Sequence, residues 1–201
     1  MTPIKNCIVN KDTTTNPIWL MRQAGRYLPE FWEIRKKNQD FIKLCLNQNL
    51  VNEITLQPLK RFDLDAAIIF SDILMIPYGL GQEVEFKKGV GPILGNINID
   101  EIISTDPKDF VQKLLPIYKG IKKVRSNLQE KNLIGFAGAP WTLLLYMLNK
   151  KSPKNNFNFE KINKDKFVIS KLLRKIEEMI CLHVDKQIEA GADVIQIFDS
   201  W

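Results

Sequence analysis

Short apolar runs alternate with longer amphipathic stretches along the chain. A short apolar run bounded by turn-forming or polar residues is typical of a buried strand, whereas apolar residues that recur every three or four positions indicate a helix. By these criteria we expect strands at residues 18–21, 65–70, 133–137 and 194–198. Helical patterns are expected between residues 31 and 62, from 107 to 128, from 142 onward and from 170 to 190, and a β-ribbon is expected at 83–86.

Local signals mark the ends of two of these helices. Asp106 followed by Pro107 is typical of an N-cap and a first helical position. Gly191 is a natural stop for the last helix, because glycine readily takes the left-handed conformation found after helix ends. The expected apolar faces are Ile117, Ile121, Val124 and Leu128 in one helix and Leu173, Ile176, Ile180 and Val184 in the other.

The alternation of strands and helices predicts parallel strands joined by right-handed crossovers. Two architectures fit this order, a doubly wound sheet and a β/α barrel. In both, ligands bind at the carboxyl ends of the strands. The polar residues that follow the expected strands are therefore the candidates for chemistry: Arg22 and Arg26 after the first, Asp72 after the second and Asp199 after the fourth.

Arg22 and Arg26 are the most suggestive of these candidates. Two guanidinium groups held close together repel one another unless an anion lies between them, and the planar fork of arginine suits a carboxylate. The chain has 23 lysines but only six arginines, four of which lie in the first 61 residues. This use of arginine favours an anion clamp, although two separate surface arginines would give the same sequence.

The composition is that of an ordinary globular protein, with 45% hydrophobic and 26% charged residues. The net charge of +6 suits an anionic ligand. The lysines are scattered and form no basic run interleaved with aromatic residues, so we do not expect nucleic-acid binding. The apolar stretch 132–149 is short for a membrane span and contains Gly and Pro, so no membrane association is expected either.

The three cysteines, Cys7, Cys45 and Cys181, are far apart and have no histidine at metal-ligand spacing. This pattern predicts reduced thiols in a cytoplasmic protein and no metal site. The only histidine, His183, lies within a helical pattern and is expected to pack or to lie on a solvated face rather than to bind a ligand. Residues 1–15 are polar and lack the apolar core of a secretory signal, so we expect them to be an extension before a single domain at 16–201.

Four blocks of sequence resemble one known family in the same order. The first is Arg-Gln-Ala-Gly-Arg-Tyr-Leu-Pro-Glu at residues 22–30; the others lie at 56–74, 135–143 and 195–201. Together they resemble the uroporphyrinogen decarboxylase family over about residue 16 to the last residue. The resemblance implies a (β/α)8 TIM barrel, which normally has eight strands and about 250 residues. We therefore expect this chain to supply roughly the first four βα units, the N-terminal half of a longer, homodimeric enzyme.

The resemblance also implies an activity, the cofactor-free removal of CO2 from the four acetate side chains of uroporphyrinogen III to give coproporphyrinogen III in heme biosynthesis. The pyrrole ring accepts the electrons left by CO2 once it is protonated. The matching aspartate, Asp72, would stabilise that positive charge beside the ring nitrogens. Without the resemblance, Asp72 would be read as a cap for the turn at Ile73 and Leu74.

Further site residues follow from the same resemblance. Arg22, Arg26 and Arg35 match arginines that bind substrate carboxylates, and Arg22 is also a candidate for proton delivery. The backbone of Gln23, Ala24 and Gly25 lies between the first two and is expected to offer N–H donors. Tyr146 matches a tyrosine near the aspartate and the substrate. A solvated helix position for Arg35 and a core position for Tyr146 remain open alternatives.

Two other functions compete with this interpretation. A related barrel methyltransferase would use zinc held by Cys and His residues at strand ends. A fragment that binds anionic tetrapyrroles without turnover would need no catalytic residues at all.

Overall fold

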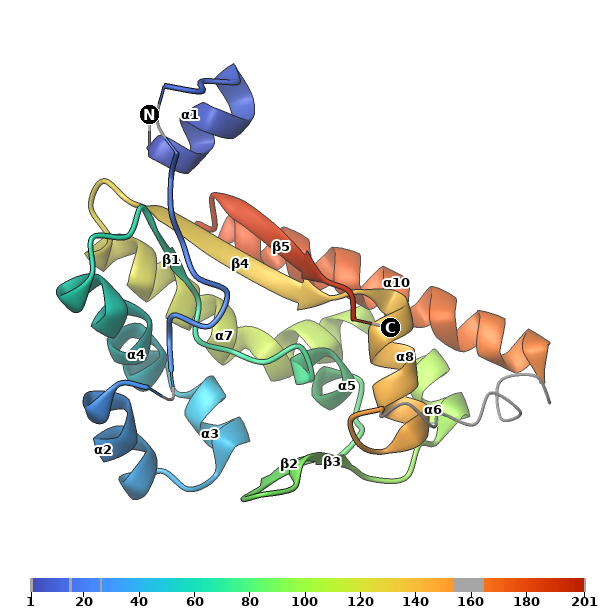
Figure 1. Cartoon of the computed structure of the whole chain (residues 1–201). Helices are drawn as coiled ribbons and strands as arrows, with labels where there is room; N and C mark the ends of the chain where they lie inside the picture. Colours follow the sequence, from blue (N-terminus) through green and yellow to red (C-terminus); the bar gives the residue numbers. More distant parts are fainter. Residues whose placement is uncertain (1, 15, 26, 154–164, 201) are drawn as a thin grey trace. The chain divides into compact units, whose positions relative to one another are not determined.

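The computed structural model describes residues 2–14, 16–25, 27–153 and 165–200. Its central feature is a three-stranded sheet with the order β1-β4-β5 (Figure 1). Strand β1 (Ala66–Ile68) pairs in parallel with β4 (Asn132–Gly138), so that Ala66 lies opposite Asn132. Strand β5 (Val194–Phe198) lies on the other side of β4. The expected parallel α/β sheet is therefore confirmed.

The chain forms two compact units. The first consists of Met1–Asp72, Leu115–Phe136 and Val184–Gln196, and the second consists of Ile73–Leu114, Ala137–His183 and Ile197–Trp201. Strands β4 and β5 and the long helices α7 (Pro107–Asn127) and α10 (Lys166–Glu189) each contribute to both units.

In the first unit, helix α4 (Gln48–Arg61) packs against α2 (Pro29–Lys37), α3 (Phe41–Leu46) and strand β1. Asp40 and Asn47 cap α3 and α4, each accepting hydrogen bonds from backbone N–H groups of the first turn. Thr55, buried in the middle of α4, accepts a hydrogen bond of 3.0 Å from the N–H of Phe70. This bond fixes the chain just after β1, where the candidate Asp72 follows.

Helix α1 (Pro3–Asn10) was not expected from the polar N-terminal sequence. It is anchored by Asn132 at the start of β4, whose Oδ1 accepts hydrogen bonds from the N–H groups of Ile4 (3.1 Å) and Lys5 (3.4 Å). Because these two donors belong to the first turn of the helix, a side chain far along the sequence serves as its cap. Ile4 is buried by the same arrangement.

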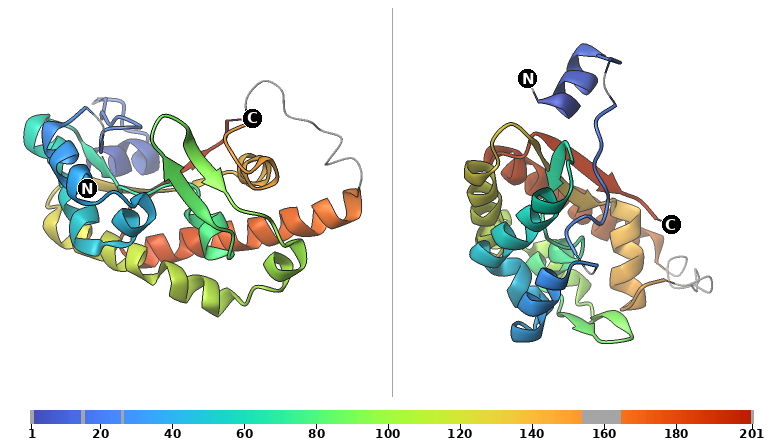
Figure 2. Two further views of the ribbon diagram at one scale, coloured as in Figure 1. Left: turned by 90° about the horizontal axis from the view of Figure 1, so that it is seen from below. Right: turned by 60° about the vertical axis from the view of Figure 1, so that its left-hand side comes forward.

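The second unit contains the short helices α5 (Met75–Gly79) and α6 (Ile99–Ser104), helix α8 (Pro140–Asn149) and the antiparallel ribbon of β2 (Val84–Lys87) and β3 (Gly91–Leu94). The ribbon confirms the expected pairing and is seen most clearly in Figure 2. Gly89 and Gly91 have φ values of +77° and +95°, which suit the tight turn between the two strands.

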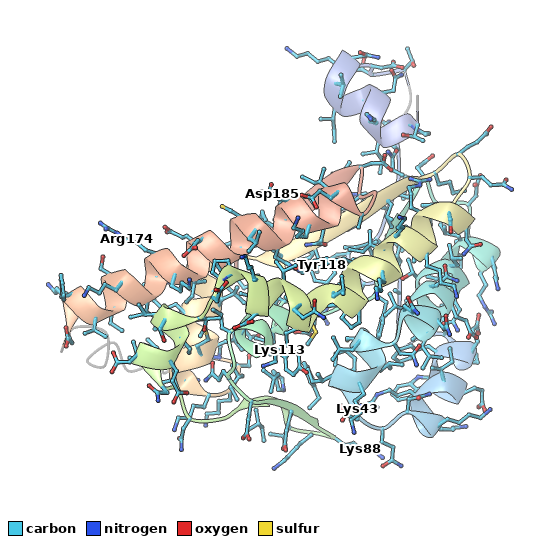
Figure 3. All side chains as sticks on the ribbon, turned by 180° about the vertical axis from the view of Figure 1, so that it is seen from behind. Lys43, Lys88, Lys113, Tyr118, Arg174 and Asp185 are labelled. Carbon is cyan, nitrogen blue, oxygen red and sulfur yellow. The ribbon has the colours of Figure 1, made fainter. Side chains whose placement is uncertain are left out.

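The two long helices begin and end largely as the sequence indicates. Asp106 Oδ1 accepts a 2.7 Å hydrogen bond from the N–H of Lys108, which confirms it as the cap of α7. Lys113 and Tyr118 both lie on α7 (Figure 3); the Lys113 Nζ lies 4.6 Å from the centre of the Tyr78 ring, whereas Tyr118 is buried. Gly191, with φ +111°, follows the end of α10.

The buried stripe of α10 differs in part from the expected face. It consists of Leu172, Ile176, Met179, Ile180, His183 and Gln187, while Leu173 and Val184 are only half-buried. A purely apolar pattern missed the last two members of this stripe because a histidine and a glutamine occupy core positions.

The expected strand at residues 18–21 is wrong. Ile18, Leu20 and Met21 are each more than half exposed (56%, 51% and 56%), and the segment is irregular. Ile18 O accepts one backbone hydrogen bond from Asp65 (2.9 Å), but the Ile18 N–H is taken by the Asp65 carboxylate at 2.6 Å instead of a strand carbonyl. At Leu20 the chain turns, because its carbonyl accepts from Gln23. An extended segment that makes a single ladder bond is not a strand.

No helix in the described part of the chain is long and apolar enough to cross a membrane.

Candidate functional site

Gln23 organises the loop that carries the candidate arginines. Its side chain is fully buried, its Nε2 donates to the carbonyl of Ala66 at 2.7 Å, and its Oε1 accepts from the N–H of Leu20 at 2.9 Å. The backbone N–H of Gln23 donates to Leu20 O at 3.1 Å. The amide group of Gln23 therefore joins the loop to the first residue of β1, and neither its side chain nor its N–H is directed to a ligand.

The rest of this loop is braced by its own residues. The Tyr27 hydroxyl donates to the carbonyl of Gln23 at 2.7 Å, and the N–H of Leu28 donates to Gly25 O at 3.1 Å. Gly25 is buried, Ala24 is half-buried and Arg22 is exposed. Arg26 lies outside the described residues, so the paired guanidinium groups of the expected clamp remain a prediction.

The same sequence block contains an ion pair that sequence reasoning missed. Arg61 Nε donates to Glu30 Oε1 at 2.7 Å, and its second nitrogen donates to Oε2 at 2.9 Å. This two-pronged contact lowers the pKa of the Glu30 carboxyl. Both residues belong to blocks singled out in the sequence, but no local pattern shows that a partner lies 31 positions away.

Arg35 lies in the last turn of α2 and is half-buried. Its guanidinium donates to the carbonyl of Asn38 and lies 5.6 Å from the centre of the Phe41 ring. An arginine that is oriented in this way is not the fully solvated helix residue that the sequence left as an alternative.

Arg35 and Asp72 both act on the buried thiol of Cys45. Burial and then the negative charge of Asp72 raise the pKa of the Cys45 thiol well above its usual range, while Arg35 opposes them. A carboxylate and a guanidinium thus share one neighbourhood beside an apolar interior. This neighbourhood lies within the first unit.

Asp72 is half-buried and follows β1 by four residues. The Phe70 ring just before it packs against the rings of Phe31 and Phe41, with centroids 5.8 and 5.7 Å apart. Helix α5 begins after Leu74, whose side chain makes no capping bond. A half-buried carboxylate is less fully screened by water than an exposed one, so it interacts more strongly with a positive charge that forms next to it.

Tyr146 lies on α8 in the second unit and is half-buried. Its hydroxyl lies 3.3 Å from Ser152 Oγ. The phenol therefore has a polar neighbour and is not a purely apolar core residue.

Gln187 forms a second buried amide contact, within the first unit. Its Oε1 accepts from the N–H of Phe136 at 3.0 Å and its Nε2 donates to the carbonyl of the same residue at 2.9 Å. Gly135 makes this possible, because a Cβ there would lie 2.6 Å from Gln187 Oε1. The sequence singled out the block around Gly135 but not its partner on α10.

His183 is buried, as expected of a packing residue, and burial lowers its pKa to about 4. Among the residues that the structure describes, no three His, Cys, Asp or Glu side chains come together as a metal site would require.

Comparison with known proteins agrees with the motifs. The family model for uroporphyrinogen decarboxylase matches residues 1–201. Among curated relatives, uroporphyrinogen decarboxylase of Chelativorans sp. is 46% identical over 92% of this chain and 55% of its own length. The enzymes of Campylobacter jejuni and Rickettsia felis are 43% and 44% identical, covering 95% and 96% of this chain and 57% and 56% of theirs.

A solved methyltransferase from Methanosarcina mazei has a similar fold, with a TM-score of 0.74 over 96% of this chain and 57% of its own, at 16% identity. At that identity the likeness concerns the fold alone. The chain spans a little over half the length of the curated relatives it matches. The match of the family model over the whole sequence, together with the identity to these relatives, shows that the chain belongs to the uroporphyrinogen decarboxylase family.

Proposed function

We propose that this chain forms part of an enzyme that removes CO2 stepwise from the four acetate side chains of uroporphyrinogen III, giving coproporphyrinogen III. Each step breaks one C–C bond, releases CO2 and consumes one proton, so that an acetate becomes a methyl group. No metal or organic cofactor is required, because the protonated pyrrole ring accepts the electron pair. The observation that carries the proposal is the half-buried Asp72 at the end of β1 in a member of this family.

Asp72 acts on the charge that develops during the reaction. Protonation of the ring creates a cation, and a fixed carboxylate beside the ring nitrogens stabilises it most where the charge is greatest. The half-buried position of Asp72 supports this role, because a partly desolvated carboxylate is screened less by water. The positive charge of Arg35 acts on the same thiol, that of Cys45, as the negative charge of Asp72.

The substrate is rich in carboxylates, and the arginines carry the opposite charge. Arg22 is exposed on a loop that Gln23 fixes to β1, so its fork can reach a ligand without unfolding the loop. We assign Arg26 and Arg35 the same carboxylate-binding role, Ala24 and Gly25 the role of backbone N–H donors, and Tyr146 the role of a polar contact to the substrate.

The proposal extends to the whole protein. The complete enzyme has the (β/α)8 barrel, of which this chain supplies roughly the first half, and it acts as a homodimer in the cytoplasm; the described residues form three strands in this sheet instead of the four expected. The length of the relatives, of which the chain covers 55–57%, supports the first of these statements.

Anaerobic incubation of the intact protein with uroporphyrinogen III tests the function. The products are oxidised to porphyrins and separated by chromatography according to carboxylate number. We expect successive loss of carboxylates, ending at coproporphyrin. A protein that binds the tetrapyrrole but returns it unchanged would be a binding protein, and the proposal would be wrong.

A further inference from the structure

The hydroxyl of Thr142 joins two segments that the sequence separates by more than fifty residues. Thr142 lies in the first turn of α8 and is fully buried. Its Oγ1 donates to Asp199 Oδ1 at 2.7 Å and accepts from the N–H of Ser200 at 2.9 Å. The N–H of Ala139 donates to Phe198 O at 2.8 Å. Three hydrogen bonds thus hold the chain that leaves β5 to the start of α8, all within the second unit.

The two bonds of the hydroxyl depend on one another. A hydroxyl has a single proton to donate, so giving it to the Asp199 carboxylate directs a lone pair of Oγ1 toward the N–H of Ser200. No other short side chain provides a donor and an acceptor at one atom in this way except serine. Valine, which has the same shape as threonine, provides neither.

The joined residues occupy the ligand-binding edge of an α/β protein. Asp199 and Ser200 directly follow β5, and ligands bind at the carboxyl ends of parallel strands. Thr142 and Tyr146 are four positions apart on α8 and therefore lie on the same helix face. The hydroxyl consequently holds the end of β5 beside the face of α8 that presents Tyr146.

The negative charge of Asp199 explains why its position matters. The Asp199 side chain is exposed, and a mobile carboxylate at this edge would repel a substrate rich in carboxylates. Bonded to Thr142 at the positive, N-terminal end of α8, its charge is partly compensated and its position is fixed.

We propose that Thr142 is a positioning residue of the tetrapyrrole site, which acts by fixing Asp199 and the Ser200 main chain at the end of β5. The inference rests on the proposed function for the identity of the ligand. It does not depend on Asp72 or on turnover, because a misplaced carboxylate weakens binding as well as catalysis.

The test compares variants of the intact protein. Thr142→Val removes both bonds at nearly constant shape, and Thr142→Ser keeps them. Thr105→Val is the matched control, since it removes another threonine hydroxyl bond, from Thr105 Oγ1 to Glu101 O, away from β5. Asp199→Ala, alone and combined with Thr142→Val, completes a double-mutant cycle. The measurements are kcat and KM with uroporphyrinogen, the Kd for the fluorescent oxidised analogue uroporphyrin, and the thermal midpoint.

We expect Thr142→Val to weaken porphyrin binding and to lower kcat/KM by about tenfold or more. Thr142→Ser should restore most of the loss, and Thr105→Val should leave both values unchanged. The effects of Thr142→Val and Asp199→Ala should fall well short of additive, because both variants remove the hydrogen bond between Thr142 and Asp199. Wild-type binding and kinetics in Thr142→Val, or additive effects, would overturn the inference alone. Wild-type protein that binds uroporphyrin without turnover would refute the proposed activity. The inference about Thr142 would then be tested by comparing the Kd for uroporphyrin between the wild type and the variants.

Discussion

The buried amide of Gln187 allows a quantitative prediction about the stability of the first unit. Its two hydrogen bonds, 3.0 and 2.9 Å long, satisfy both the N–H and the carbonyl of Phe136 in β4. Gln187→Met keeps the length and volume of the side chain but removes its donor and its acceptor. Both hydrogen bonds to the backbone of Phe136 are then lost in a part-buried place.

The expected cost follows from these two groups. A typical hydrogen bond contributes about 0.5–1.5 kcal/mol net, so loss of the two should cost roughly 1–3 kcal/mol. In a protein of this size each kcal/mol lowers the thermal midpoint by about 2–4 °C. We therefore expect the midpoint of Gln187→Met to fall by at least about 2 °C.

The assay is thermal and urea denaturation of the intact protein, with hydrogen exchange of the peptide that contains β4. Gln112→Met on α7 is the control, because it makes the same substitution at an exposed helical position. The variant should melt earlier than the control and exchange the Phe136 amide faster. Equal midpoints and equal protection in the two variants would refute the reasoning, since the amide would then contribute nothing to β4.

Three further predictions concern charge, burial and close packing. Arg22→Lys and Arg26→Lys keep the charge but lose the fork, so affinity or turnover should fall by about tenfold or more; wild-type kinetics in both would exclude the clamp. Because burial lowers the pKa of His183 from the usual 6.5 to about 4, protons bind the unfolded chain more tightly, and stability should be lost as the pH falls from about 6.5 toward 4. Urea midpoints across this range should show a shallower loss in His183→Gln, and an unchanged slope would contradict the assignment. Gly135→Ala places a Cβ 2.6 Å from Gln187 Oε1 and should destabilise the protein by about 1–3 kcal/mol in the same denaturation assay. An unchanged midpoint would show that α10 can shift to accommodate the added methyl group.

The sequence predicts those parts of the fold that are decided by neighbouring residues. Strand β5 begins and ends where its apolar run does, and Asp106 caps α7 as its position before Pro107 indicates. The segment at Ile18 has an equally apolar run, but whether it forms a strand depends on a hydrogen-bonding partner. In the structure, the Asp65 carboxylate takes the place of that partner.

Long-range polar contacts are the part that the sequence does not reveal. Gln187 and Phe136 are 51 positions apart, and the bonds of Thr142 span 57 and 58. Each depends on two elements packing in a particular register, which no local pattern specifies. Asp72 could be singled out because it follows the apolar run at 65–70, but the rings of Phe31 and Phe41 that pack on Phe70 come from α2 and α3, which no local pattern indicates.

The most direct test of the account is the charge of Asp72 in the intact enzyme. Asp72→Asn keeps the shape and one acceptor but removes the charge, Asp72→Glu keeps the charge but displaces it, and Asp185→Asn on the exposed surface of α10 (Figure 3) is the control. The measurement is kcat and KM for uroporphyrinogen III, with a thermal melt of each variant. If the carboxylate stabilises the ring cation, Asp72→Asn depresses kcat strongly and changes KM less, Asp72→Glu retains partial activity, and the control is unaffected. A near-normal kcat in Asp72→Asn would contradict the account, because asparagine can replace aspartate as a cap but not as a counter-charge.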